Sequence, residues 1–126
     1  MDSQNTDQKL AVITGGASGI GLSCSKRFAK EGYAVLIIDA NKEAGEQELK
    51  SLRSDGYNAD FAYCDITKHE QVAAIFQGLA EQNKCAQVLV NCAGISPALN
   101  ALHEYPVEEW HRAIDINLHG TFYACR

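Results

Sequence analysis

Thr14-Gly-Gly-Ala-Ser-Gly-Ile-Gly21 follows a short apolar run, Leu10-Ala-Val-Ile13, and leads into a segment with the periodicity of a helix. The apolar run is typical of a buried strand. In the segment over residues 19–31, apolar residues recur on one helix face at Ile20, Cys24 and Phe28. A glycine-rich turn placed between a strand and a helix predicts the first part of a β-α-β unit.

The three spaced glycines of this turn suit a site for an anionic group. Gly15 permits a tight turn, Gly19 lets the backbone come close to a pyrophosphate, and Gly21 permits close packing of the helix on the sheet. Free N–H groups and the helix dipole at the start of the helix attract that anion. A purely structural glycine turn is the alternative. A P-loop is disfavoured, because Leu22 stands where that motif needs its phosphate-binding lysine.

Strand-like and helix-like segments alternate along the rest of the chain. Further strands are predicted over residues 34–38, 59–64 and 87–90. Helices are predicted over residues 41–54 with Asn41 as the cap, after the capping box Thr67-Lys-His-Glu70, and from Pro106 at the first turn of a last helix. The apolar side of that last helix comprises Trp110, Ile114, Leu118 and Phe122.

This alternation predicts a single α/β domain over residues 1–126. A strand that is apolar throughout, as residues 34–38 are, is typical of a parallel sheet covered on both faces. We expect a three-layer Rossmann-type parallel sheet, truncated to about four strands, with right-handed crossovers and the strand order 3-2-1-4. Residues 1–8 are polar and are expected to be flexible.

Two acids follow the second and third predicted strands. Asp39 ends the second strand, where a carboxylate can accept hydrogen bonds from both hydroxyls of an adenosine ribose. Asp65 follows the third strand, where it can accept a hydrogen bond from the adenine amino group. A solvated loop acid is the alternative for Asp39, and a simple acid beside a helix cap is the alternative for Asp65.

Together these residues resemble the classical type of short-chain dehydrogenase/reductase family. The family's Thr-Gly-x-x-x-Gly-x-Gly motif is matched by Thr14, Gly15, Gly19 and Gly21, its acid after the second strand by Asp39, and its Asp-hydrophobic pair by Asp65-Ile66. The family's Asn-Asn-Ala-Gly appears as Asn91-Cys-Ala-Gly94, with Cys92 as the departure. Ile116-Asn-Leu-His-Gly120 looks like its Asn-hydrophobic-x-Gly stretch, so the resemblance covers essentially the whole chain.

The resemblance implies NAD(H) as the cofactor, because the family's acid at the position of Asp39 marks a preference for NAD. The cofactor-binding residues that it implies are Gly15, Ser18, Gly19, Ile20, Gly21, Asp39, Asp65, Ile66, Asn91, Ala93 and Gly94. It also makes Asn117 the asparagine of the catalytic tetrad, which holds a water that relays protons to the active-site lysine. From the residues alone, Asn117 is better explained as a satisfied buried amide, since it shares a helix face with Trp110 and Ile114.

The rest of that tetrad has no match. The family's serine and its Tyr-x-x-x-Lys lie beyond the asparagine, and no tyrosine of this chain has a lysine four residues on. We therefore expect the cofactor-binding half of an NAD(H)-dependent oxidoreductase that interconverts an alcohol and a carbonyl, with the C-terminal catalytic half absent and the chain inactive alone. The full-length parent is expected to act on a small alcohol or ketone and to form a homo-oligomer. A non-catalytic dinucleotide-binding or interaction module is the alternative.

Composition argues against several other classes. The net charge of −5 and the pI near 5.3 disfavour a nucleic-acid or anionic-membrane partner. No signal-peptide core is present, and no apolar run approaches the ~20 residues of a membrane span. Five widely spaced cysteines without a Cys-x-x-Cys pair indicate a reduced, cytoplasmic protein. His111, Asp115 and His119 share a helix stripe but lack a fourth ligand, so no metal site is predicted.

Overall fold

The computed structural model describes residues 7–126, and its strands form a four-stranded parallel sheet in the order β3-β2-β1-β4. This is the predicted order. Residues 1–6, which belong to the segment expected to be flexible, lie outside the described residues. The strands are β1 (Leu10–Thr14), β2 (Ala34–Asp39), β3 (Ala59–Tyr63) and β4 (Ala86–Asn91). The first three helices are α1 (Gly19–Lys30), α2 (Lys42–Ser54) and α3 (His69–Glu81), and the last two are α4 (Val107–Ile114) and α5 (Gly120–Cys125).

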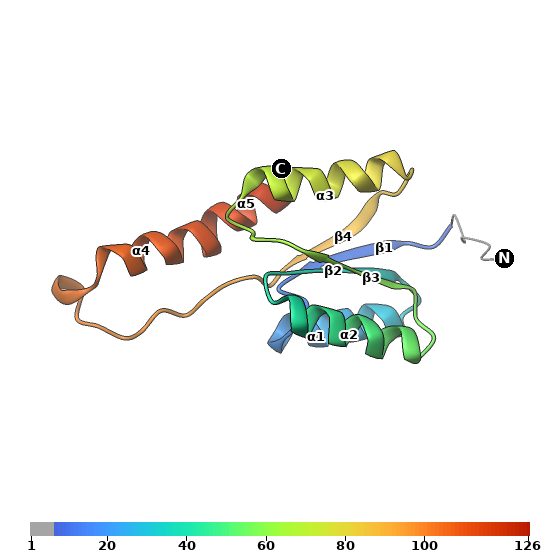
Figure 1. The fold of residues 1–126 in the computed structure, drawn as a ribbon, viewed down its shortest axis with the longest axis horizontal. Coiled ribbons are helices and arrows are strands. Elements are labelled where there is room, and N and C mark those ends of the chain that lie inside the picture. The colour runs from blue at the N-terminus through green and yellow to red at the C-terminus, as the bar shows by residue number, and fades with distance from the viewer. Residues whose placement is uncertain (1–6) are drawn as a thin grey trace.

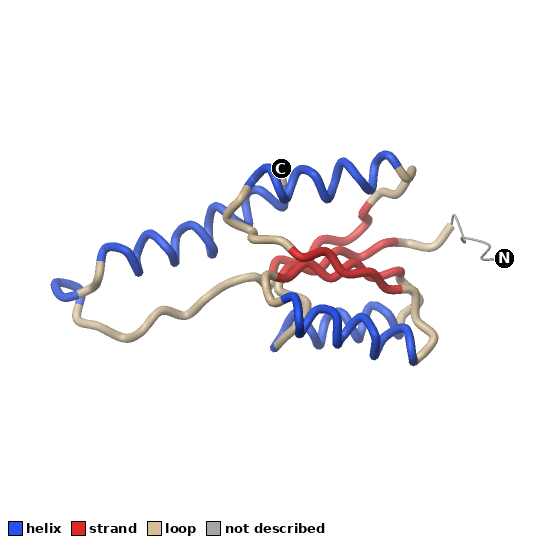
Figure 2. Tube along the Cα trace, viewed as in Figure 1, coloured by secondary structure: helices blue, strands red, loops and turns tan. Residues whose placement is uncertain are grey.

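Helices cover both faces of the sheet, which gives the three expected layers (Figure 1). α1 and α2 lie on one face, and α3 and α5 lie on the other. The strands form the layer between them (Figure 2). Every residue of β1 is buried, and so are the four central residues of β2. Continuous burial of this kind explains why both strands are apolar without alternation.

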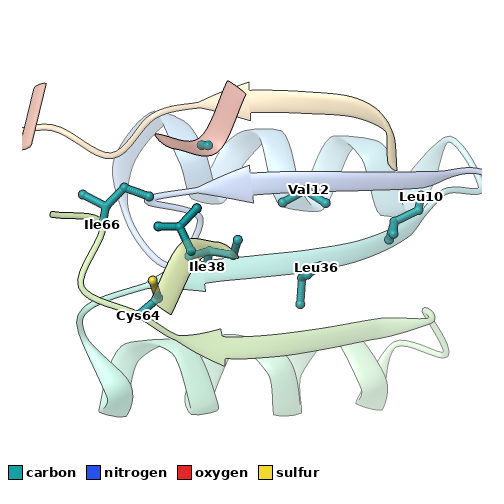
Figure 3. Packing of buried hydrophobic residues seen from close by; sticks show 8 residues of the cluster. Leu10, Val12, Leu36, Ile38, Cys64 and Ile66 are labelled. Carbon is teal, nitrogen blue, oxygen red and sulfur yellow. The ribbon is translucent and has the colours of Figure 1, made fainter. Parts of the chain in front are cut away.

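Side chains of the central strands enter two cores, one on each face of the sheet. Figure 3 shows the core on the side of α3 and α5, where the strand residues Leu10, Val12, Leu36 and Ile38 pack with Cys64, Ile66, Val72 and Ala124. The core on the side of α1 and α2 contains Ala11, Ile13, Val35, Ile37, Ala29 and Leu52. These two cores fix the strands in register, so the loops at their carboxyl ends are held in place.

The structure confirms one of the two predicted helix caps and contradicts the other. The side-chain oxygen of Asn41 accepts a hydrogen bond from the Ala44 amide at 3.0 Å, which confirms the cap of α2. The capping box at residues 67–70 is wrong, because α3 begins at His69 with Lys68 at the cap position and has no side-chain cap. The Thr67 hydroxyl is engaged elsewhere, since it donates to Asp65 Oδ1 at 2.7 Å.

The last predicted helix consists of α4, a π-helical turn over Asp115–His119, and α5 in series. A short 3-10 turn, Leu102–Glu104, precedes it, and Pro106 occupies the position before α4. In Figure 1, α4 extends away from the sheet, whereas α5 lies over it beside α3.

The core-facing side of this helix differs from the apolar side expected from the sequence. Trp110, Leu118 and Phe122 keep 55%, 58% and 58% of their surface exposed. The core is contacted instead by Ile116 and Ala124, and Gly120 between them is buried. Gly120 permits the close approach, because a Cβ at this position would lie 2.7 Å from the Ile66 side chain.

Candidate functional site

A cleft of about 440 Å³ lies at the carboxyl ends of the strands. Open parallel sheets bind their ligands at this edge, and the volume is in the range of small-molecule and cofactor sites. The predicted residues that line it are Gly15, Ser18, Gly19, Ile20, Gly21, Asp39, Asp65, Ile66, Ala93 and Gly94. Asn91 and Asn117 are not among the lining residues.

The glycine turn is closely packed against the backbone around it. The Gly15 amide donates to the Ile38 carbonyl at 2.8 Å, and a Cβ on Gly15 would lie 2.7 Å from the Ala93 nitrogen. A Cβ on Gly21 would overlap the carbonyl oxygen of Gly15. The third glycine therefore lets the start of α1 pack against the turn itself, in addition to the packing on the sheet expected from the sequence.

The start of α1 offers its first amides to the cleft. Ser18 takes the cap position in an extended conformation, and its side chain makes no capping hydrogen bond. Gly19 has a φ of +54°, and among residues 7–126 no atom lies within 4 Å of where its Cβ would be, so the turn is open on that side. The first N–H groups of a helix lack partners within the helix, so these amides are available to an anion.

Both carboxylate oxygens of Asp39 accept backbone hydrogen bonds. Oδ2 accepts from the Ala17 amide at 3.1 Å, and Oδ1 accepts from the Asn41 amide at 2.9 Å. Ala17 belongs to the glycine turn, and Asn41 is the N-terminal cap of α2. Asp39 therefore joins these two segments while it also lines the cleft.

Asp65 is held by its neighbour Thr67. Its Oδ1 accepts from the Thr67 amide at 3.0 Å and from the Thr67 hydroxyl. The hydroxyl hydrogen bond lowers the pKa of the Asp65 carboxyl below its ordinary value, although partial burial acts in the opposite direction. The site therefore presents a stable negative charge near the ends of β2 and β3.

The segment after β4 is anchored to β1 and to α5. The Ala93 amide donates to the Thr14 hydroxyl at 3.2 Å. The Asn91 side chain points to α5 and donates to the Cys125 sulfur at 3.4 Å. Burial, together with the adjacent Cys24 thiol, raises the pKa of the Cys92 thiol. A thiol that stays protonated is a weaker nucleophile than a thiolate.

The Asn117 side chain forms two hydrogen bonds with the loop that follows β4. Its Oδ1 accepts from the Ile95 amide at 2.8 Å, and its Nδ2 donates to the Ile95 carbonyl at 2.9 Å. The amide is satisfied, as expected from the residues alone, but Asn117 is exposed and not buried. It lies in the π-helical turn, a feature that is frequent at functional sites.

The sequence pattern of the family described as short chain dehydrogenase matches residues 9–126. This chain belongs to the short-chain dehydrogenase family. The match confirms the resemblance drawn from the motifs, and it includes both the glycine turn and the segment around Asn117.

Relatives within the short-chain dehydrogenase family include enzymes of varied names. The chain is 39% identical over 122 residues to the 3-hydroxyacyl-CoA dehydrogenase type-2 of Rattus norvegicus, a match that covers 93% of this chain and 46% of that protein. A solved NAD+-bound xylitol dehydrogenase has a TM-score of 0.89 at 30% identity, with coverage of 97% and 47%. A variant of actinorhodin polyketide ketoreductase with NADPH has a TM-score of 0.89 at 34% identity, with coverage of 96% and 46%. The chain thus spans just under half the length of these relatives.

Several residues that line this short-chain dehydrogenase cleft were missed by reasoning from the sequence, and the charged residue among them is Arg112. Arg112 of α4 lines the cleft four residues before Ile116, which lines it too. Among the described residues that line the cleft, Arg112 is the only cation, beside the two acids Asp39 and Asp65. The spacing of four residues from Ile116 was the available signal, but Arg112 belongs to the helix side that was not expected to face the sheet.

Residues 7–126 contain no group of three or more side chains suited to hold a metal ion. Within the stripe considered for a metal, His119 Nδ1 lies 3.0 Å from Asp115 Oδ1. In the same part of the chain, no helix is long and apolar enough to cross a membrane.

Proposed function

We propose that this chain is the cofactor-binding part of an NAD(H)-dependent oxidoreductase that interconverts an alcohol and a carbonyl. The observation that carries the proposal is the cleft at the carboxyl ends of the strands, lined by the glycine turn and by the Asp39 carboxylate. Membership of the short-chain dehydrogenase family and the names of the relatives support the oxidoreductase class.

The residues of the cleft fit a dinucleotide. The amides at the start of α1, left uncapped by Ser18, suit the pyrophosphate. Gly19 presents no side chain to the open side of the turn, so the backbone can approach that group. Both hydrogen bonds from Thr67 go to Oδ1 of Asp65, so its Oδ2 suits the adenine amino group. The cofactor supplies the hydride, and the protein supplies position and electrostatics.

NAD(H) is proposed over NADP(H) because of Asp39. With NAD, the carboxylate accepts hydrogen bonds from the ribose hydroxyls, whereas in NADP one hydroxyl is replaced by a phosphate. Two like unit charges about 4 Å apart repel by roughly 4 kcal/mol at an effective dielectric near 20. Solvent and relaxation reduce this repulsion, so we expect a discrimination of about 2–4 kcal/mol, or roughly 30- to 1000-fold in Kd. The relatives include both an NAD+-bound and an NADPH-bound protein, so this preference must come from the residues of this chain.

Calorimetric titration of the chain with NADH and NADPH tests the cofactor assignment. The expected result is tighter binding of NADH, and equal or tighter binding of NADPH contradicts the assignment. Asp55→Ala removes an exposed acid at the end of α2, which does not line the cleft, and is expected to leave both affinities unchanged. Arg112→Met removes the only cation among the described residues that line the cleft, and we expect it to weaken the binding of both cofactors alike, because both carry an anionic pyrophosphate. A loss confined to NADPH would show that Arg112 serves the 2′-phosphate.

For the reaction, we propose that Asn117 acts by fixing the loop after β4 through its two hydrogen bonds to Ile95. General acid–base residues typically contribute about 100- to 10,000-fold to a rate. The chain contains no Tyr-x-x-x-Lys, so we propose that it does not turn over a small alcohol or ketone by itself. The purified chain would be assayed for NADH formation with a panel of alcohols, and protein-dependent turnover at ordinary enzyme rates would contradict this part of the proposal.

A further inference from the structure

Asp39 holds two separate backbone segments through one carboxylate. Its Oδ2 accepts from the Ala17 amide of the glycine turn, and its Oδ1 accepts from the Asn41 amide at the start of α2. A residue that served only to meet a ribose would need neither of these bonds.

Other groups hold the rest of the glycine turn, so the part that depends on Asp39 is the Ala17 amide. The Gly15 amide donates to the Ile38 carbonyl, and the Gly16 carbonyl accepts from the Ser25 hydroxyl at 3.2 Å. Further along the chain, the Ser18 carbonyl accepts a hydrogen bond from the Leu22 amide within α1. Ala17 lies between Gly16 and Ser18, and among the described residues its amide has Asp39 as its partner.

Burial makes this bond costly to lose. Ala17 is only 5% exposed, so water cannot readily replace the carboxylate as the acceptor of its amide. A buried donor left without a partner costs its full desolvation penalty, which exceeds the net value of an ordinary hydrogen bond. The turn then has to move to expose the amide, and Ser18 and Gly19 at the start of α1 move with it.

We propose that Asp39 is a positioning residue for the glycine turn: it fixes the Ala17 amide and thereby the first amides of α1, independently of any contact with a ribose. Only the effect of Asp39 on dinucleotide binding rests on the proposed function. Removing Asp39 to admit a 2′-phosphate then loosens the pyrophosphate site at the same time, so loss of the charge alone does not produce an NADP(H) site.

Amide hydrogen exchange on the cofactor-free chain tests the proposal, because no dinucleotide is present to meet Asp39. We expect Asp39→Ala to lower the protection of the Ala17 amide at least tenfold, equivalent to about 1.4 kcal/mol. The protection of Val12 in the fully buried β1 is measured in the same samples and normalises for any change in global stability. Asp65→Ala removes the other acid of the cleft and is expected to leave Ala17 unchanged. Equal Ala17 protection in the unmutated chain and in Asp39→Ala, after this normalisation, would overturn the proposal.

A spectroscopic measurement on the unmutated chain covers the case in which Asp39→Ala does not fold. NMR scalar couplings across the two hydrogen bonds, from the Ala17 and Asn41 amide nitrogens to the Asp39 carboxyl carbon, are expected in the unmutated chain. Asp39→Asn keeps one acceptor oxygen and is expected to restore part of the Ala17 protection. Absence of the coupling between the Ala17 amide and Asp39 would overturn the proposal. Failure of the unmutated chain to bind NADH, with Ala17 protection still dependent on Asp39, would contradict the proposed function and leave this inference intact.

Discussion

Replacing Gly21 by alanine is expected to destabilise the chain although alanine favours a helix. Gly21 lies in the first turn of α1, and the Cβ of an alanine would overlap the carbonyl oxygen of Gly15 and lie 2.7 Å from its carbon. Both atoms belong to the backbone of the glycine turn, so no side-chain rotation can relieve the contact. Either the helix start or the turn has to shift.

The magnitude follows from two opposing effects. Overpacking of a closely packed site costs roughly 1–3 kcal/mol, and a rigid backbone neighbour places Gly21→Ala near the upper end. Alanine in place of glycine within a helix contributes about 1 kcal/mol of stabilisation. We therefore expect a net loss of about 2 kcal/mol in the free energy of unfolding, together with weaker binding of any anion at the start of α1.

Gly78→Ala is the matched control. Gly78 lies within α3, and no atom comes within 4 Å of where its Cβ would be. The same chemical change should there stabilise the chain by about 0.5–1 kcal/mol, because only the helix propensity changes. The two variants thus differ by roughly 3 kcal/mol, which at about 1–3 kcal/mol per molar of urea separates their unfolding midpoints by about 1–3 M. A Gly21→Ala variant that unfolds at the same urea concentration as the unmutated chain, or higher, would refute this reasoning.

Three further outcomes are expected. Thr67→Val removes the main cause of the lowered pKa of Asp65, so the pKa of this carboxyl should rise toward its ordinary value of 3.8 in an NMR titration. A carboxyl whose pKa is lower in the folded than in the unfolded chain stabilises the fold at pH values above its unfolded pKa. As the pH falls below about 4, the unmutated chain should therefore lose more stability than Thr67→Val, and parallel losses would contradict this. Burial raises the pKa of the Cys64 thiol to about 11, so Cys64 should resist alkylation in the native chain while the exposed Cys125 reacts; equal labelling would show that the core opens. Light scattering over a concentration series should show self-association through the free edge of β4 and the exposed apolar side of the last helix, and the double variant Trp110→Ser with Phe122→Ser should reduce it. A chain that stays monomeric at all concentrations would contradict that expectation.

The fold was predictable because several independent signals agree. The apolar strands 10–13 and 34–38, the glycine turn between the first strand and helix, and the repeated alternation all favour a parallel sheet. Each predicted strand end lies within one residue of the end in the structure. The cap at Asn41 was also predictable, since its side-chain oxygen accepts from the Ala44 amide and has no other acceptor role among residues 7–126. The capping box was not, because the hydroxyl of Thr67 had a closer acceptor in the Asp65 carboxylate.

Much of the candidate cleft was predictable for the same reason, since its residues lie in loops directly after strands. The bond of Asp39 to Ala17 was not predictable, because it depends on how two loops far apart in sequence approach each other, whereas the bond to Asn41 is a local contact two residues along the chain. Sequence spacing placed Asp39 at the end of a strand, and only the fold showed that both of its oxygens are engaged.

The face of the last helix that contacts the sheet could not be predicted from apolarity. Two rows of residues at a spacing of four run along this helix, one through Trp110, Ile114, Leu118 and Phe122 and the other through Arg112, Ile116, Gly120 and Ala124. The first row is the more apolar, yet the second contacts the cleft and the core. A row of this spacing drifts by about 40° per step around a helix of 3.6 residues per turn, and the wider π-helical turn over Asp115–His119 reduces that drift. The small residues Gly120 and Ala124 then let the helix approach Ile66 closely, and the same turn directs Asn117 to Ile95. Close approach through small side chains therefore decides the orientation here, and it brings Arg112 over the cleft and Asn117 to the loop after β4.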